Sequence, residues 1–112
     1  MARYLVTGEF VDPGALLPPQ QLAQLIEKLV LPSFEAMAKL EEKKKILGGG
    51  LFAGARAGAF ILDVASNSEV NQILQGLPFW GLVKWTVTPL QEYRERAADE
   101  KKAIEQMKAS LS

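Results

Sequence analysis

The sequence contains no cysteine and no histidine. Without cysteine there is no disulfide, no thiolate nucleophile and no thiolate-bound metal, a composition compatible with the cytoplasm. Without histidine, Ser-His-Asp and Cys-His catalysis are excluded, as are the usual zinc, haem and non-haem iron ligand sets. Any chemistry must therefore use carboxylates, Lys, Arg, Tyr or a bound ligand, and we expect no metal site.

The chain also lacks an excess of charge of one sign and a long apolar run. Thirteen Lys and Arg balance thirteen Asp and Glu, so no net positive field attracts phosphate backbones or anionic lipid. No apolar stretch approaches the roughly 20 residues that span a bilayer, and the start, MARYLVTGEF, has no signal-peptide layout. We expect a cytoplasmic protein that binds neither nucleic acid nor membranes.

Length and composition are those of one folded domain. The 112 residues are 48% hydrophobic and 23% charged, values typical of globular proteins and far from those of disordered chains. A chain of this length holds one hydrophobic core. We therefore expect a single domain over residues 1–112.

Four segments have the composition of β-strands. Residues 3–11 are rich in β-branched and aromatic types and precede the turn sequence DPG, and residues 82–88 alternate apolar with polar side chains. The glycine-rich segment 46–53 and the segment 58–64 are joined by a turn at 54–56, which predicts a β-hairpin.

Three segments are expected to be helical. Apolar residues recur at three- and four-residue steps over residues 19–44, with one internal proline that predicts a kink. Ser66 and Glu69 form a capping box at the start of a short helix over residues 67–76. Residues 90–109 predict a charged helix with a thin apolar stripe made of Tyr93, Ala97, Ile104 and Met107.

The expected order is βαββαβ with an added C-terminal helix. Right-handed crossovers fold such a chain into a four-stranded antiparallel sheet with two helices on one face, which is the ferredoxin-like α+β fold. The other face of the sheet would expose apolar residues such as Leu5 and Ile61. Packing a second copy of the chain on that face is the simplest way to cover them, so we expect a homodimer.

Two segments resemble the muconolactone isomerase family of the dimeric α+β barrel group: AFILDVAS at 59–66 and LPFWGLVKWTVTPL at 77–90. The glycines at 48–50 are more similar to those of YCII-like proteins. The resemblance implies a homodimer or a ring of dimers, and a cofactor-free pocket for a small, often cyclic, organic acid or ketone. It also implies an isomerase that shifts a double bond by moving a proton, which needs a base, an acid and a group that holds enolate charge.

Polar side chains on the first and last strands are the candidate catalytic residues. Glu9 and Lys84 are on strands that lie side by side in a ferredoxin-like sheet, with Thr7 and Thr86 as neighbouring ligand-binding groups. In a desolvated pocket Glu9 would act as the base and Lys84 would steady an enolate. The alternative is a salt bridge across the open sheet face or the dimer seam. The Tyr4 hydroxyl either donates to an oxyanion or reaches solvent.

A second group of candidates would bind the ligand. Arg56 in the hairpin turn is a fork donor for a ligand carboxylate or else a solvated tip. Phe79, Trp80 and Trp85 either line a pocket for a planar ligand or pack in the core. No phosphate-loop pattern surrounds the glycines at 48–50, which favour a bulge or a close approach of a ligand or partner backbone. The run EEKKK at 41–45 is expected to be a solvated helix end.

Three functions fit these observations. The first is a cofactor-independent isomerase that uses carboxylate and lysine groups on a small cyclic organic acid or lactone. The second is a binding or accessory protein with the same fold and pocket but no committed acid-base pair. The third is an assembly module that holds partners with its C-terminal helix. Fold alone does not choose among them.

Overall fold

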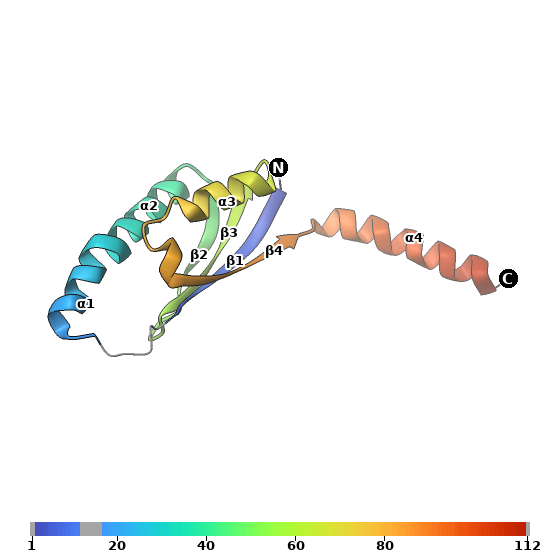
Figure 1. The fold of residues 1–112 in the computed structure, drawn as a ribbon. Coiled ribbons are helices and arrows are strands. Elements are labelled where there is room, and N and C mark those ends of the chain that lie inside the picture. The colour runs from blue at the N-terminus through green and yellow to red at the C-terminus, as the bar shows by residue number, and fades with distance from the viewer. Residues whose placement is uncertain (1, 12–16, 112) are drawn as a thin grey trace.

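The computed structural model describes residues 2–11 and 17–111, so the predicted DPG turn at 12–14 lies outside the described residues. The ferredoxin-like α+β fold predicted from the sequence is confirmed (Figure 1). One antiparallel sheet has the strand order β2-β3-β1-β4. Its strands are β1 (Ala2–Phe10), β2 (Ile46–Leu51), β3 (Ala57–Val64) and β4 (Val83–Leu90).

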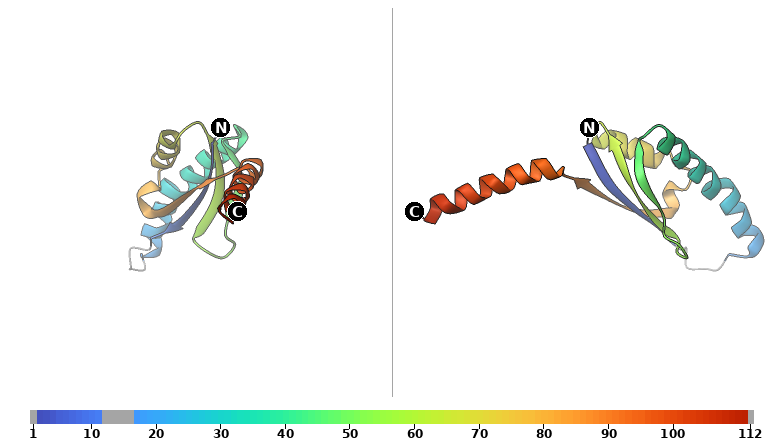
Figure 2. Two further views of the ribbon diagram at one scale, coloured as in Figure 1. Left: turned by 90° about the vertical axis from the view of Figure 1, so that its right-hand side faces the viewer. Right: turned by 180° about the vertical axis from the view of Figure 1, so that it is seen from behind.

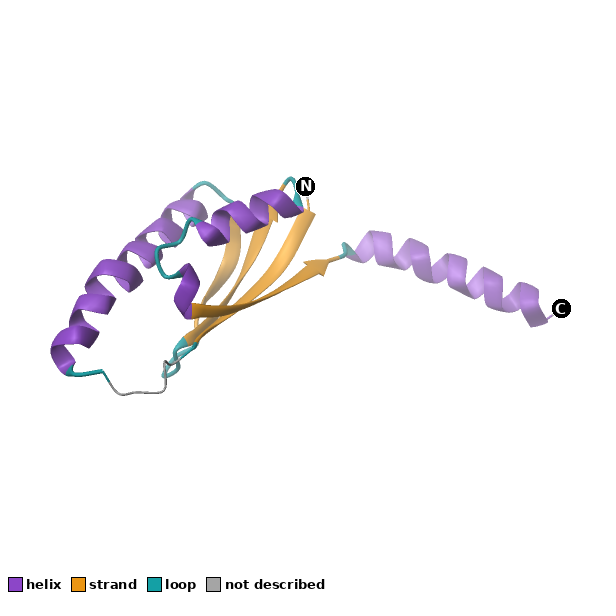
Figure 3. Cartoon of the chain, in the orientation of Figure 1, coloured by secondary structure: helices purple, strands orange, loops and turns teal. Residues whose placement is uncertain are grey.

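The helices between residues 19 and 75 lie on one face of the sheet, whereas the C-terminal helix does not (Figure 3). Between them and the sheet lies a core whose most deeply buried apolar side chains come from the two central strands, where Val6, Leu62 and Val64 are fully buried. The short helix α3 (Asn67–Gln75) adds Val70 and Leu74 to this core. On the opposite face Leu5 and Ile61 are cross-strand partners and are half-buried, so the sheet has one covered and one open face.

The single kinked helix expected over residues 19–44 consists of three consecutive segments, α1 (Pro19–Leu25), a π-helical turn η1 (Ile26–Val30) and α2 (Leu31–Glu42). The π turn precedes Pro32, which has no N–H to donate and whose ring would clash with the carbonyl one turn earlier in a regular α-helix. The wider turn is closed by a bond from the Leu31 N–H to the Ile26 carbonyl, and the helix continues past the proline.

The glycine-rich strand β2 contains an irregularity between Ile46 and Gly48, as the bulge expected from these glycines requires. Gly49 has a φ of +126°, and a Cβ there would lie 2.2 Å from the Ala59 carbonyl oxygen. Only glycine fits both the backbone angle and the space, so this residue allows β2 to pair closely with β3.

Helix α3 begins with the predicted capping box. Ser66 Oγ accepts a hydrogen bond from the Glu69 N–H at 3.2 Å, and Glu69 Oε1 accepts one from the Ala65 N–H at 3.0 Å. The second Glu69 oxygen binds Lys45 Nζ at 2.5 Å, which links the start of α3 to the residue before β2. A 3₁₀ turn, η2 (Trp80–Leu82), then leads into β4.

The last helix, α4 (Tyr93–Leu111), projects away from the rest of the molecule (Figure 2). None of its residues is buried. Because the helix projects, the longest dimension of the molecule is 71 Å. The helix begins later than expected, because β4 continues to Leu90. Within the described ranges, no helix is long and apolar enough to cross a membrane.

Candidate functional site: an apolar cavity between helix and sheet

A cavity of about 610 Å³ lies between the helix layer and the sheet. This volume is within the range of small-molecule sites. Its outer wall is one apolar face of the long helix, with side chains from Leu22, Leu25, Ile26, Val30, Phe34 and Met37. The wall exists because these residues recur at helical spacing across the π turn, which keeps the apolar face of α1 in line with that of α2.

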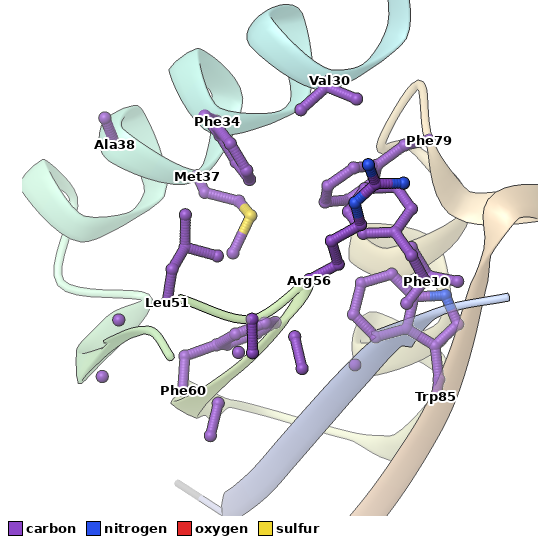
Figure 4. A pocket seen from close by; sticks show the side chains of 18 of the residues that line it. Phe10, Val30, Phe34, Met37, Ala38, Leu51, Arg56, Phe60, Phe79 and Trp85 are labelled. Atoms are coloured by element: carbon purple, nitrogen blue, oxygen red, sulfur yellow. The ribbon is translucent and has the colours of Figure 1, made fainter. Parts of the chain in front are cut away.

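Aromatic rings form the inner end of the cavity (Figure 4). Phe79 contacts three other rings edge to face, with centroid distances of 5.5 Å to Phe10, 5.8 Å to Phe34 and 6.0 Å to Trp85. Such edge-to-face contacts fix ring orientation as well as position. A fourth edge-to-face contact joins Phe60 to Trp85, with a centroid distance of 6.4 Å. The five rings therefore form one connected array.

A buried serine holds this array from behind. Ser33 is fully buried, donates a hydrogen bond to the Leu29 carbonyl at 2.6 Å and accepts one from the Phe79 N–H at 2.9 Å. The hydroxyl therefore uses both its donor and its acceptor, as a buried polar group must. It ties the loop that carries Phe79 to the helix that carries Phe34.

One row of residues in the floor of the cavity crosses all four strands. Leu51 pairs with Gly58, Gly58 with Gly8, and Gly8 with Trp85. All four line the cavity. The two central strands thus present glycines side by side where other rows carry bulky side chains.

Only two charged side chains are found among the described residues that line the cavity, Glu41 from α2 and Arg56 from the β2–β3 turn. The side chain of Arg56 extends into the cavity (Figure 4). Its backbone is anchored, because the Arg56 carbonyl accepts a hydrogen bond from the Phe10 N–H at 3.0 Å. Both side chains are exposed, which places the charges at the rim and leaves the interior apolar.

Three of the predicted ligand-binding residues line this cavity: Arg56, Phe79 and Trp85. Trp80 does not line it. It is exposed, and its carbonyl accepts a hydrogen bond from Trp85 Nε1 at 3.3 Å. Tyr4 is buried in the core, where its hydroxyl donates to Asn67 Oδ1.

The four remaining predicted residues lie together on the sheet, but outside the cavity. Thr7 pairs with Thr86 and Glu9 with Lys84 in the β1–β4 register, as expected from the fold. Side chains alternate along a strand, and Gly8 and Phe10 face the cavity, so this polar patch lies on the open face of the sheet. The catalytic role of Glu9 and Lys84 stays a prediction, and within one chain it has no part in the cavity.

Sequence reasoning missed several residues of the site. Glu41 was interpreted as part of a solvated helix end, and nothing in the EEKKK run separates it from its neighbours. Ser33 does carry a signal, since it is one polar residue between the apolar steps of a helix. Gly8 and Gly58 carry another, because glycine inside a strand often marks a close approach. In the part of the chain that the structure describes, no cluster of three Asp or Glu side chains is arranged to hold a metal ion.

The fold and the cavity define an α+β protein of the ferredoxin-like class with a ligand-sized pocket under its helix layer. More particularly, the chain belongs to the muconolactone isomerase family, since the family model described as muconolactone delta-isomerase matches residues 11–96. The family predicted from the two C-terminal segments is therefore confirmed.

Two solved structures are similar in fold. The crystal structure of muconolactone isomerase at 3.3 Å resolution aligns with a TM-score of 0.67 and 20% identity, covering 81% of this chain and 90% of that chain. The 5-chloro-2-hydroxyhydroquinone dehydrochlorinase of Burkholderia phenoliruptrix AC1100, in complex with 2,5-dihydroxybenzoquinone, aligns with a TM-score of 0.52 and 23% identity, covering 81% and 96%. A sequence comparison with curated proteins gives no match.

Proposed function

We propose that this protein binds a small, ring-shaped organic acid or lactone in the cavity and isomerises it by proton transfer without a cofactor. One observation carries the proposal: a cavity of about 610 Å³ whose lining is apolar except for Glu41 and Arg56. An apolar interior takes up the ring, and a cation at the rim selects an anionic group. Membership of the muconolactone isomerase family supports this ligand class.

Arg56 would hold the acidic group of the ligand. A guanidinium presents a planar fork that binds both oxygens of a carboxylate, and its charge is permanent. Arg56 is exposed at the rim, so solvent screens part of this attraction. In a bound lactone or enone, the same charge would stabilise the enolate that forms during the reaction.

Glu41 is the candidate base of the cavity. Its carboxylate would take a proton from the carbon next to the ligand carbonyl, leaving an enolate; because Glu41 is exposed, that proton would exchange with solvent before the carboxyl group protonates the far end of the conjugated system. The double bond moves and no redox change occurs. A single carboxylate suffices, since the same group acts first as base and then as acid.

The homodimer is part of the proposal. The half-buried pair Leu5 and Ile61 on the open face supports the packing of a second copy there. In that assembly Glu9 and Lys84 would lie at the seam between subunits. Light scattering tests this, and a monomer of 12.3 kDa at working concentration would count against it.

Binding is tested with a panel of unsaturated lactone acids, aromatic acids and their neutral methyl esters, using shifts in melting temperature and calorimetry. Arg56→Gln should weaken the acids roughly tenfold, because a bond to a charged group at an exposed rim is partly screened. The esters should be unaffected. Arg94→Gln on α4 is the matched control, and an equal loss in that variant would contradict the role of Arg56.

Catalysis is tested separately by deuterium uptake from D₂O into bound ligand. Glu41→Gln should keep ligand affinity and lose most of the exchange, whereas Glu42→Gln, which does not line the cavity, should behave as the natural protein. If the natural protein binds an acid tightly yet exchanges no proton in any ligand of the panel, the alternative holds: a non-catalytic binding or accessory protein.

A further inference from the structure

We infer that Gly8 and Gly58 are specificity-determining residues that set the thickness of the ring the cavity accepts. The inference rests on the proposed function, because it concerns the ligand of the same cavity. The two glycines are direct cross-strand partners on the central strands β1 and β3. Both line the cavity, so at this level the central strands add no side chains of their own to its floor.

The space above Gly8 is occupied by an aromatic ring from the neighbouring strand. A Cβ at this position would lie 3.0 Å from Trp85 Cζ3 and 2.9 Å from Val83 Cγ1. These distances are too short for ordinary carbon contacts. The indole of Trp85 can therefore lie low over the sheet only because residue 8 has no side chain.

Gly58 has the same relation to the other edge strand. A Cβ there would lie 3.0 Å from Leu51 Cδ2 and 3.0 Å from the Gly50 carbonyl oxygen. Leu51 is the cross-strand partner of Gly58, as Trp85 is of Gly8. The edge strands β2 and β4 thus each lay one side chain over a central glycine.

Backbone conformation does not explain these glycines. The positive φ angles among described glycines belong to Gly49 and Gly54, so residues 8 and 58 have a backbone that alanine also adopts. A methyl group at residue 8 would displace Val83 and Trp85, and one at residue 58 would displace Leu51 and the Gly50 carbonyl group of β2. We expect the displaced Trp85 and Leu51 side chains to move toward the helix, which would lower the free height above the floor of the cavity.

The same-face neighbours along the two central strands are large rings. Phe10 follows Gly8 on β1, and Phe60 follows Gly58 on β3; both line the cavity. The glycine pair is therefore a hollow between two bulky positions. A ligand ring in this hollow would have Trp85 and Leu51 beneath it and the apolar face of the helix above it. The distance between those two side chains and the helix therefore limits how thick a ring the cavity accepts.

The test compares a flat acid with a puckered acid of similar size, benzoate and cyclohexanecarboxylate, by calorimetry on the full chain. Gly8→Ala should weaken cyclohexanecarboxylate at least roughly fivefold more than benzoate, because overpacking penalises the thicker ring first. Gly58→Ala should do the same from the other side of the hollow, which keeps the test available if one variant folds poorly.

Two controls separate thickness from general damage. Gly48→Ala introduces the same change at a residue of β2 that does not line the cavity and where no atom lies within 4 Å of the new Cβ, and it should leave both affinities unchanged. Adding Trp85→Phe to Gly8→Ala gives the aromatic side chain room to settle, and it should restore part of the lost affinity for cyclohexanecarboxylate.

The outcomes distinguish this inference from the proposed function. If the natural protein binds both acids and the alanine variants change the two affinities by the same factor, the glycines do not select ring thickness, although the proposed ligand site stands. If the natural protein binds neither acid nor any other member of the ring-acid panel, the ligand site itself is wrong and the inference falls with it.

Discussion

Ser33 is the residue on which the aromatic array most depends. Its side chain is fully buried. The hydrogen bond from the Phe79 N–H joins the loop that carries Phe79 to the helix, and the hydrogen bond to the Leu29 carbonyl stabilises the π-helical region. Removing the hydroxyl would leave the Phe79 N–H buried without an acceptor, a larger cost than the loss of an ordinary hydrogen bond.

Ser33→Ala should lower the free energy of unfolding by about 1–3 kcal/mol, measured by urea denaturation. Ser110→Ala is the matched control, because Ser110 also donates to a helix carbonyl, that of Met107, but is exposed. That variant should change stability little. Equal losses in the two variants would contradict the structural role given to Ser33.

The Glu69 carboxylate gives the protein an acid-sensitive link. Its pKa lies below the ordinary value of 4.5, first because it accepts the Ala65 N–H and next because it is bonded to Lys45. A lowered folded-state pKa means that the stabilisation is present above the unfolded pKa and is lost as the pH falls through the lower folded value.

Glu69→Gln should therefore lower the melting temperature at pH 7 but not at pH 2.5. Scanning calorimetry across that range would show the difference between the two proteins shrinking as the pH falls below about 4.5. A difference that stays constant with pH would mean that the charge of Glu69 contributes nothing and that only its shape matters.

At the scale of elements, the sequence patterns predicted the strands and helices because each is a local signal. The alternation of Val83 and Trp85 with Lys84 indicated β4, and the pair Ser66 and Glu69 indicated the start of α3. The pairing of Glu9 with Lys84 followed from strand order and is present in the register. Local chemistry and topology rules were enough for these features.

The cavity could not be predicted in the same way. A period of two shows which residues share a face, but in β1 both faces carry apolar residues, Tyr4 and Val6 on one and Leu5 on the other, so the pattern does not tell which face the helices cover. The sequence therefore left two placements open for the polar patch at Glu9, a pocket or the open face of the sheet, and the alternation of side chains along β1 puts it on the open face. The hollow itself depends on a cross-strand glycine pair, a tertiary feature.

Helix α4 contributes nothing to the core of its own chain. Its residues from Tyr93 to Leu111 include no buried side chain, and its apolar stripe, with Tyr93 95% exposed, has no contact surface in the body of the molecule. A chain ending at Gln91 should therefore keep the fold of its remaining elements. Its far-UV circular dichroism should differ from that of the full chain only by the helical signal of the removed residues.

The melting temperature of that shortened chain should lie within a few degrees of the natural protein, measured at a concentration where both have the same oligomeric state. A large fall at matched oligomeric state would show that α4 packs against the body in solution. A fall that appears only together with a change of oligomeric state would instead assign the helix to assembly.

At the scale of the whole molecule, one sheet separates two different surfaces. The covered face encloses an apolar cavity with Glu41 and Arg56 at its rim. The open face carries the polar patch of Glu9 and Lys84 together with Leu5 and Ile61. We assign ligand binding to the first surface and contact with a second copy to the other.

The most direct test of this assignment is a crystal structure of the protein with the tightest-binding ring acid of the panel. We predict that the ring lies in the cavity above Gly8 and Gly58, with its carboxylate within hydrogen-bonding distance of Arg56. A ring bound on the open face, with its carboxylate at Lys84, would contradict the account.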